Sequence, residues 1–467
     1  MSNPGRVSGC VLCILAMIGI LGLAGLGVGA PVSDNLPTGL AVDENGNAYV
    51  TGQSGPTGNT EWVTVRYDRR GKRAWVRRYN GPAAGYNRPT GIAVDSAGNA
   101  YVTGPSVGSG GDHDHDFATI KYDSSGKQSW VQRYNGPAAG SDWPTGIAVD
   151  SGGNAYVTGD SQISGSQWDF TTIKYDSSGK ALWTKRYNGP YKGSSRPYGI
   201  AVDSSGNAYV TGDSQSGEST FDFATVKYDK SGKQVWAKRY TRSGSSFNTP
   251  VGLGTSNESV YVGGSTYGNP GETNFTVVRY DRNTGAAKWV RIYNDIVGAD
   301  TPAGIAVDSA GNAYITGSSG GGDFQTVRYD SAGNQVWVRN YNGPAGGTDY
   351  GRSIAVDSSG NIYVTGQSPG VGTGTDFATI KYGPCGTPQW ERRFNGAGNG
   401  LEDPAAIAVD SSGNVYVTGR SQLNSAGENG FATVQYDSSG NQTWVSYYSG
   451  QSDQNPPGTP WLPLLLD

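Results

Sequence analysis

The sequence predicts an all-β protein, an eight-bladed β-propeller with four antiparallel strands in each blade. The first observation is a passage that recurs eight times, at intervals of 49 to 55 residues, with aromatic and glycine residues at fixed places. Repeats of about 40 to 50 residues with such landmarks indicate a propeller or a solenoid array. A tyrosine in a GNAYVTG-like run marks each copy: Tyr49, Tyr101, Tyr156, Tyr209, Tyr261, Tyr314, Tyr363 and Tyr416. A tryptophan later in the copy marks it again: Trp75, Trp130, Trp183, Trp236, Trp289, Trp337, Trp390 and Trp444.

The second observation is the strand pattern within one copy. In the second copy the strands are expected at residues 91–95 (GIAVD), 100–104 (AYVTG), 117–122 (FATIKY) and 130–134 (WVQRY). The first is an apolar run that fits a buried strand, and the second alternates in polarity. DSAGN and DSSGK form tight turns between strands one and two and between three and four, because Asp accepts backbone hydrogen bonds and Gly adopts positive φ. The other two connections are longer and vary between copies, as in a propeller blade.

The passages GIAVDSAGNAYVTG and DFATIKYDSSGKQSW resemble the bacterial β-propeller repeat called SBBP, and more loosely the NHL repeats. The resemblance covers about residues 37–450 and recurs eight times. It implies a propeller on a secreted or surface protein of bacteria, and it brings no activity and no catalytic residues with it. NHL repeats place strand one innermost. By that analogy each blade uses consecutive chain, and blade eight closes the ring by packing on blade one.

We expect three segments along the chain. Residues 1–30 combine Arg6, an apolar stretch and small residues at Gly29 and Ala30, which is typical of a cleaved signal peptide; an uncleaved membrane anchor is the alternative. Residues 31–450 form the propeller, and 451–467 form a Pro-rich tail that covers the closing seam. The blades are expected to start near residues 38, 90, 145, 198, 250, 303, 352 and 405.

Composition narrows the possible partners. The net charge of -4 argues against nucleic acid, because that binding needs a basic surface. Cys385 is the one cysteine after the leader, so no internal disulfide is available to the exported domain. We expect a secreted or cell-surface monomer without a cofactor, which meets a membrane only if the leader stays uncleaved.

Strand four carries a stripe of basic residues. We interpret them as protection of an exposed outer edge strand, with adhesion to acidic polymers as the alternative. The stripe contains Arg77, Arg78, Arg133, Lys185, Arg186, Lys238, Arg239, Arg291, Arg339, Arg392 and Arg393.

The variable loops are the expected place for binding, since rigid scaffolds carry function on their loops. Residues just before each first strand should surround the mouth of the central channel, where Arg88 and Arg196, two blades apart, could converge on one anionic group. Tyr198 follows Arg196 by two residues in the sequence. Packing of Trp143 and Trp168 on neighbouring blades is the structural alternative. The expected ligand-binding residues are Arg88, Trp143, Trp168, Arg196, Tyr350, Arg352 and Glu402.

The two histidines suggest a candidate metal-binding site. They alternate with carboxylates in Asp112, His113, Asp114 and His115, residue types that bind divalent metals. A solvated polar loop explains the same pattern, so no metal site is assigned. The repeated Asp residues of the tight turns are interpreted as turn residues and not as calcium ligands or catalytic groups.

The sequence therefore predicts an exported binding module that contacts an extracellular glycan or protein at the channel mouth. The alternative is an extracellular carbohydrate-active enzyme, a hydrolase or lyase that uses carboxylates there. A third interpretation is a surface spacer without a small ligand. The carboxylates considered for catalysis are Asp142, Asp300, Asp349, Glu402 and Asp403.

Overall fold

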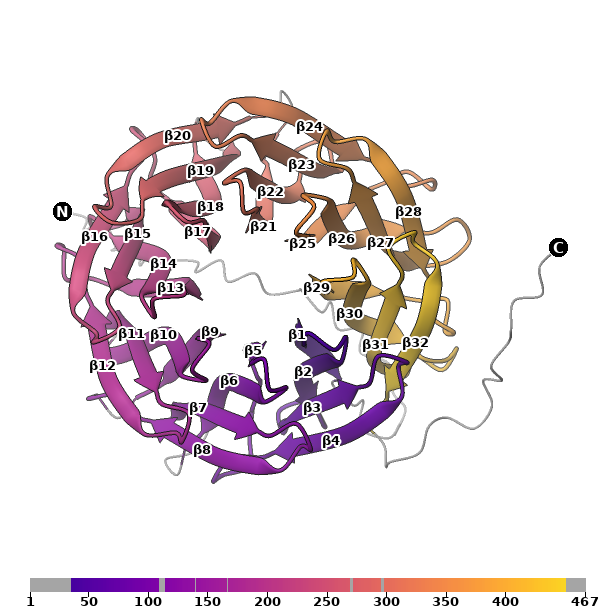
Figure 1. Ribbon diagram of the computed structural model, residues 1–467, viewed down its shortest axis with the longest axis horizontal. Coiled ribbons are helices and arrows are strands. Elements are labelled where there is room, and N and C mark those ends of the chain that lie inside the picture. Colours follow the sequence, from indigo (N-terminus) through magenta and orange to yellow (C-terminus); the bar gives the residue numbers. More distant parts are fainter. Residues whose placement is uncertain are drawn as a thin grey trace, which may run out of the picture.

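Eight four-stranded antiparallel sheets radiate around a central channel (Figure 1). The computed structural model describes residues 35–108, 114–138, 140–165, 167–268, 272–294 and 298–450. The expected signal peptide and the tail at 451–467 lie outside this range. Each sheet contains four consecutive strands, so the prediction of an all-β, eight-bladed propeller is confirmed.

The strands of the eight blades follow one another in chain order. Blades 1 to 4 are β1 (Leu36–Val42), β2 (Ala48–Ser54), β3 (Glu61–Tyr67), β4 (Arg73–Tyr79); β5 (Gly91–Val94), β6 (Ala100–Val107), β7 (His115–Tyr122), β8 (Gln128–Tyr134); β9 (Asp142–Val149), β10 (Ala155–Ser164), β11 (Gln167–Tyr175), β12 (Ala181–Tyr187); β13 (Ser195–Val202), β14 (Ala208–Gln215), β15 (Phe221–Tyr228) and β16 (Gln234–Tyr240). Blades 5 to 8 are β17 (Asn248–Thr255), β18 (Ser259–Tyr267), β19 (Thr273–Asp281), β20 (Ala287–Tyr293); β21 (Thr301–Val307), β22 (Ala313–Ser318), β23 (Phe324–Tyr329), β24 (Gln335–Tyr341); β25 (Tyr350–Val356), β26 (Ile362–Pro369), β27 (Thr375–Tyr382), β28 (Pro388–Phe394); β29 (Asp403–Val409), β30 (Val415–Gln422), β31 (Asn429–Tyr436) and β32 (Gln442–Tyr448).

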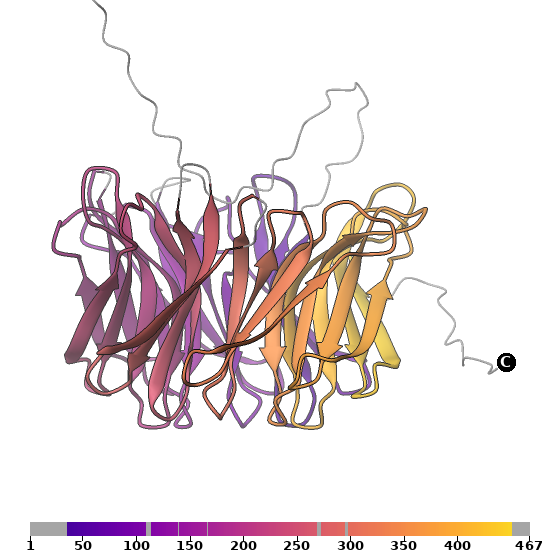
Figure 2. The ribbon, with the colours of Figure 1, turned by 90° about the horizontal axis from the view of Figure 1, so that it is seen from above.

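The first strand of every blade lines the channel and the fourth forms the outer rim (Figure 1). Tight turns lie on one side of the disc, here called the hairpin face, and longer connections lie on the other, here called the loop face (Figure 2). No helix long and apolar enough to span a membrane occurs in the part of the chain that the structure describes.

The tight turn between strands one and two is organised by one carboxylate. Asp43 Oδ1 accepts hydrogen bonds from the backbone N–H groups of Asn45 and Asn47, both at 2.9 Å, and Gly46 adopts φ 76°. The Tyr49 hydroxyl donates to Asp43 and to the Gly98 carbonyl of the next blade, both at 3.0 Å. The repeated Asp is thus a turn residue, and the repeated Tyr joins neighbouring blades.

The core lies between blades. Tyr49, Trp62 and Trp75 of blade 1 pack against Ala100, Val102, Ile120 and Tyr122 of blade 2, and this arrangement repeats around the ring. The buried Trp75 Nε1 donates to the Ser124 carbonyl at 3.2 Å, in the third-to-fourth strand turn of the next blade. Large aromatic rings with one polar tip suit this position, because the tip finds an acceptor while the ring is buried.

Many cations of the strand-four stripe also join blades, a role that the edge-protection interpretation did not foresee. Arg77 Nε donates to the Gly126 carbonyl of the next blade, and its guanidinium lies over the Trp75 ring. Arg133 turns the other way and donates to the Tyr79 hydroxyl of the preceding blade at 2.9 Å.

Ring closure uses side-chain contacts and no strand exchange. Tyr416 Oη of blade 8 donates to the Gly46 carbonyl at 3.0 Å, and Arg78 of blade 1 donates to the Tyr448 hydroxyl at 2.6 Å. Asn35 adds bonds to the carbonyls of Asn429 and Ser449, both at 3.0 Å. The contacts of Tyr416 and Arg78 are of the same kind as those that join consecutive blades.

Candidate functional site

The repeat supplies its own controls, because each residue has an equivalent in the other blades. One informative position follows the glycine of the second strand, at the loop-face end, and pairs with an aromatic residue of the third strand. Aspartate occupies it in blades 3 and 4 alone, so the fold itself does not require a carboxylate here. The eight residues are Gln53, Pro105, Asp160, Asp213, Ser265, Ser318, Gln367 and Arg420.

These two carboxylates share one guanidinium at the channel mouth. Asp213 in β14 pairs in register with Arg196 in β13, and Arg196 interacts electrostatically with both Asp213 and Asp160 of the preceding blade. The Tyr198 hydroxyl donates to Asp213 Oδ2 at 3.1 Å. Asp213 Oδ1 is buried and has no hydrogen-bond partner among the described residues. We call Asp160, Arg196, Tyr198 and Asp213 the mouth cluster.

Burial shifts the acidity of both carboxylates in the mouth cluster. It raises the pKa of Asp160 to about 7 and that of Asp213 to about 6, while the positive charge of Arg196 opposes the rise in each case. Asp160 keeps some contact with solvent, whereas Asp213 is almost fully buried. Burial disfavours the charged form of a carboxyl group, so these two groups change protonation state near neutral pH.

The backbone of an aromatic residue adjoins this cluster. Trp143 in β9 pairs in register with Asp160. The Trp143 ring is half-buried and lies 4.7 Å from the His115 ring of blade 2, centroid to centroid. One face of the Trp143 ring is therefore covered by His115 of the neighbouring blade.

The remaining predicted residues are spread around the loop face. Arg88 is exposed just before β5, and all of blade 3 separates its blade from that of Arg196. Tyr350 and Arg352 come together in β25, where the guanidinium lies 5.7 Å from the ring centroid and 3.3 Å from Asp403. The convergence of Arg88 and Arg196 on one anion therefore stays a prediction, and Arg196 already faces two carboxylates.

Glu402 is not available to a ligand, which corrects its selection as a contact residue. It is fully buried, and its Oε1 accepts hydrogen bonds from the N–H groups of Gly396 and Gln422 and from the Ser421 hydroxyl, at 3.1 to 3.2 Å. Burial raises its pKa. Asp142, Asp300 and Asp349 occupy the equivalent place and are also fully buried. Sequence position suggested the channel mouth, but these carboxylates point inward to cross-link the loops.

Only part of the loop that contains the two histidines lies within the described residues. Asp112 and His113 lie outside the described residues, and the Gly108 N–H donates to the Asp114 carbonyl. His115 is buried, and its Nε2 lies 3.1 Å from the Tyr86 carbonyl. No three His, Cys, Asp or Glu side chains come together as a metal site within the described ranges.

Asp160 and Asp213 were missed by the sequence analysis, although a signal for them exists. Aligning the eight copies at the GNAYVTG run places both in one column that otherwise holds Gln, Pro, Ser or Arg. The departure of two adjacent copies from the rest marks the column. Burial and the shared guanidinium become visible only when the blades are assembled.

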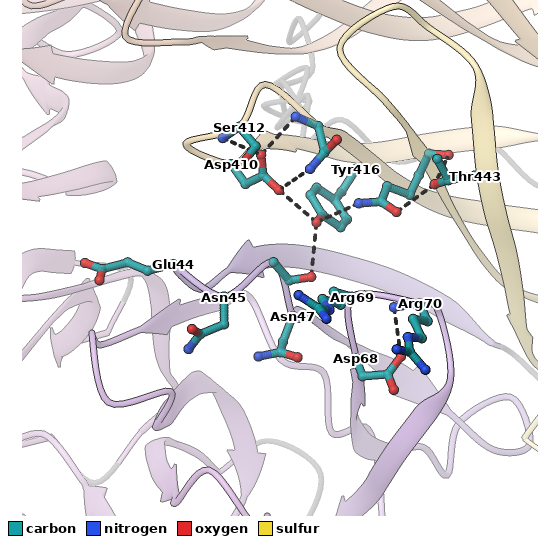
Figure 3. Close-up of a pocket in the computed structure, with 13 residues that line it drawn as sticks. Glu44, Asn45, Asn47, Asp68, Arg69, Arg70, Asp410, Ser412, Tyr416 and Thr443 are labelled. Carbon is teal, nitrogen blue, oxygen red and sulfur yellow. Dashed lines mark hydrogen bonds between the residues drawn. The ribbon is translucent and has the colours of Figure 1, made fainter.

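A cavity lies elsewhere, on the hairpin face between blades 8 and 1 (Figure 3). Its volume is about 860 Å³, whereas the equivalent space between blades 7 and 8 measures about 170 Å³. Gln435 donates to the Tyr416 hydroxyl at 2.8 Å there, and Asp410 accepts from the same hydroxyl. Asp68, Asp410 and Asn47 in its lining bind their own turns, and the cavity lies where the two ends of the ring meet.

The fold and the mouth cluster define a β-propeller repeat protein with a polar, asymmetric channel mouth. The family model described as "Beta-propeller repeat" (SBBP) matches more than half of the chain, so the protein belongs to this family. The first three strands of blade 5 lie outside the matched segments, and the turn at residues 256–258 lacks the Asp and Gly that form the first turn of the other blades. The matched segments are residues 28–55, 74–109, 130–165, 182–217, 288–325, 336–370 and 389–424.

Solved structures with a similar arrangement are distant. A quinohemoprotein alcohol dehydrogenase from Comamonas testosteroni is 13% identical, with a TM-score of 0.47; the match covers 75% of this chain and 66% of that one. A eukaryotic initiation factor is 8% identical over 89% of both chains, with a TM-score of 0.44. A putative 6-phosphogluconolactonase from Bacteroides uniformis is 13% identical, with a TM-score of 0.43, over 71% of this chain and 90% of that one. No curated protein matches this chain. These likenesses are too distant to bear on activity.

Proposed function

We propose that this protein is an exported binding module that recognises a glycan at the loop-face mouth of its channel. The observation that carries the proposal is the mouth cluster, in which Asp160 and Asp213 share Arg196 at positions where no other blade has a carboxylate. Localisation outside the cell belongs to the same proposal and rests on the leader-like residues 1–30, and a monomeric state is proposed with it.

The chemistry of the cluster suits sugar hydroxyl groups. Carboxylates and a guanidinium accept and donate directional hydrogen bonds, and the buried Oδ1 of Asp213 has an unused acceptor position. Trp143, whose backbone pairs with Asp160, offers the face of its ring that does not pack on His115 as an apolar surface for a sugar ring. Few polar groups placed among aromatic surfaces are typical of small-ligand sites.

A strongly anionic ligand fits less well. Arg196 interacts with two carboxylates, so an additional anion would meet their negative charge as well as the guanidinium. A neutral glycan avoids this repulsion. A protein ligand remains the other partner class from the sequence analysis, and it is an outcome of the experiment below.

The proposal is tested by calorimetric titration of the purified propeller with neutral oligosaccharides from cellulose, xylan, mannan and chitin. Asp160→Asn combined with Asp213→Asn keeps the side-chain size and is expected to weaken binding at least tenfold at pH 8. Ser318→Asn is the matched control, because it puts the same amide at the equivalent position of blade 6, and it should bind normally. Undiminished affinity of the double variant contradicts the mouth cluster as the site, and no binding of any sugar by the natural sequence favours a protein ligand.

Hydrolysis or elimination of a glycan is a second candidate, favoured by one observation. Two carboxyl groups with pKa values of about 6 and 7 are suited to serve as general acid and general base near neutral pH. Release of new sugar ends from the same polysaccharides measures this activity. Asp160→Asn should abolish it, whereas Glu402→Gln should affect stability instead, because Glu402 is buried away from solvent.

A further inference from the structure

Aromatic residues on the loop face are concentrated in the same sector as the mouth cluster. The residues two positions before the buried Trp or Phe of the third strand are equivalent between blades, and rings occur there in blades 2, 3 and 4 alone. Blade 6 has Gly322 at this place, and the other seven blades have a side chain. The blades without a ring have small or amide residues, so the fold does not require rings here. The seven residues are Thr60, His115, Trp168, Phe221, Thr273, Thr375 and Asn429.

The rings continue from blade 4 into blade 5. Phe221 and Phe247 stack with centroids 5.9 Å apart and planes 16° apart, and Tyr267 meets Phe247 edge-on at 6.2 Å. Phe247 is 44% exposed and Tyr267 is 37% exposed. The equivalent bridge in blade 1 pairs Thr60 with Tyr86, and no paired rings are needed to form it. Exposed apolar clusters that the fold does not demand mark interaction sites.

These rings lie close to the mouth cluster. Asp213 pairs with Phe223, and Phe221 lies two residues before Phe223 in the same strand. Asp160, Phe170 and Trp168 repeat this arrangement in blade 3. One strand spacing and two residue steps put the Cα atoms of Asp213 and Phe221 about 8 Å apart. In both blades, an aromatic residue therefore lies about two residues from the mouth carboxylate on the neighbouring strand: Trp168 for Asp160 and Phe221 for Asp213.

We infer that the ligand is a glycan chain of several sugar units that lies across the loop face of blades 3 to 5. Its hydroxyl groups bind the mouth cluster, and successive sugar rings stack on Trp168 and on the Phe247–Tyr267 surface. Two independent departures from the repeat, one acidic and one aromatic, coincide in this sector. The inference rests on the proposed function, which it deepens from a sugar site to a site for an extended chain.

The test measures affinity against chain length, with cellulose, xylan, mannan and chitin oligosaccharides of two to eight units. For the natural sequence the affinity should rise with length and then level off. Trp168→Ala combined with Phe247→Leu should lower affinity for the longest chains roughly tenfold and leave disaccharide binding nearly unchanged. Leu is the residue that blade 8 has in place of Phe247, so the substitution fits the fold.

Leu401→Ala is the matched control, because Leu401 occupies the equivalent place in blade 8 and is 39% exposed. It should leave the length dependence unchanged. Equal affinity for all chain lengths, or equal losses in the two variants, overturns the inference. The failures are distinguishable: if Asp160→Asn with Asp213→Asn abolishes binding while length has no effect, the sugar site stands and the extended chain does not. If no oligosaccharide binds the natural sequence, both fail.

Discussion

At the scale of single residues, aspartate has opposite effects on stability at two positions of blade 3. Burial raises the pKa of the turn residue Asp150, but hydrogen bonds from Asn154 and Tyr156 outweigh it and leave the pKa lowered. Asp160 lies in β10, the strand that follows this turn. It has no comparable set of donors, and burial raises its pKa to about 7. Asp150 thus stabilises its turn as an anion, whereas the mouth carboxylates are kept at a cost to stability.

This difference predicts a pH-dependent gain in stability for Asp160→Asn combined with Asp213→Asn. Both carboxyls have a higher pKa in the folded than in the unfolded chain, so the folded protein binds more protons between about pH 4 and 7 and loses stability as pH rises through this range. The variant lacks this loss, so its advantage should reach several kcal/mol at pH 8 and vanish near pH 4. Denaturant titrations at several pH values measure it; an advantage that is constant with pH contradicts the assignment.

At the scale of strands and sheets, a tyrosine hydroxyl connects each of several blades to the next. Tyr101 in β6 donates to Asp95 of its own turn at 3.0 Å and to the Gly153 carbonyl of blade 3 at 3.1 Å. Lys121 lies 4.9 Å above the ring. One residue therefore fixes its own hairpin and docks the neighbouring blade, which explains why it recurs in every copy.

Removal of that hydroxyl should loosen the contact between blades. Tyr101→Phe keeps the ring but leaves the buried Gly153 carbonyl without this donor, and it is expected to cost about 1–3 kcal/mol. Tyr191→Phe is the control, because Tyr191 is 47% exposed and should change the unfolding free energy by less than about 0.5 kcal/mol. Chemical denaturation measures both, and equal effects would mean that the hydroxyl bond adds nothing.

At the scale of the whole ring, the closing seam differs from the other blade junctions. At seven junctions a Lys or Arg of the third strand lies over the repeated Tyr ring and donates to a carbonyl in the next blade. Blade 8 has Gln435 instead, and the buried Trp444 Nε1 has no acceptor among the described residues. Gln435 lines the seam cavity at the place where the other junctions have the longer cation. The seven cations are Arg66, Lys121, Lys174, Lys227, Arg279, Arg328 and Lys381.

Restoring the cation should strengthen the ring. Gln435→Lys is expected to raise the unfolding free energy by about 1 kcal/mol, through a cation–π contact with Tyr416 and a bond to the facing turn. The nearby Arg69 does not forbid this, because Lys227 donates to the carbonyl of Arg282 in an equivalent junction. Gln442→Lys, on the exposed start of β32, is the control with the same charge change. No gain over this control in denaturation midpoint contradicts the role assigned to the seam.

Local residue patterns were sufficient to predict the blades. Asp and Gly at fixed places specify each turn, and the alternating apolar runs between them specify strands, as Asp43 and Gly46 illustrate. The candidate site was only partly predictable. Arg196 and Trp143 were selected because they precede first strands and remain candidates, whereas Glu402 was selected from a nearby loop and is buried. A position in the chain does not reveal which way a side chain points.

The sequence by itself determined the number of blades, the strand order and the aromatic contacts between blades, since these depend on short-range patterns repeated eight times. Only the tertiary structure decided which departures from the repeat meet in space. Asp160 and Arg196 belong to different blades, and their proximity arises from the packing of β10 beside β13. Electrostatic coupling and burial depend on distances through space, and the assembled ring alone fixes those distances.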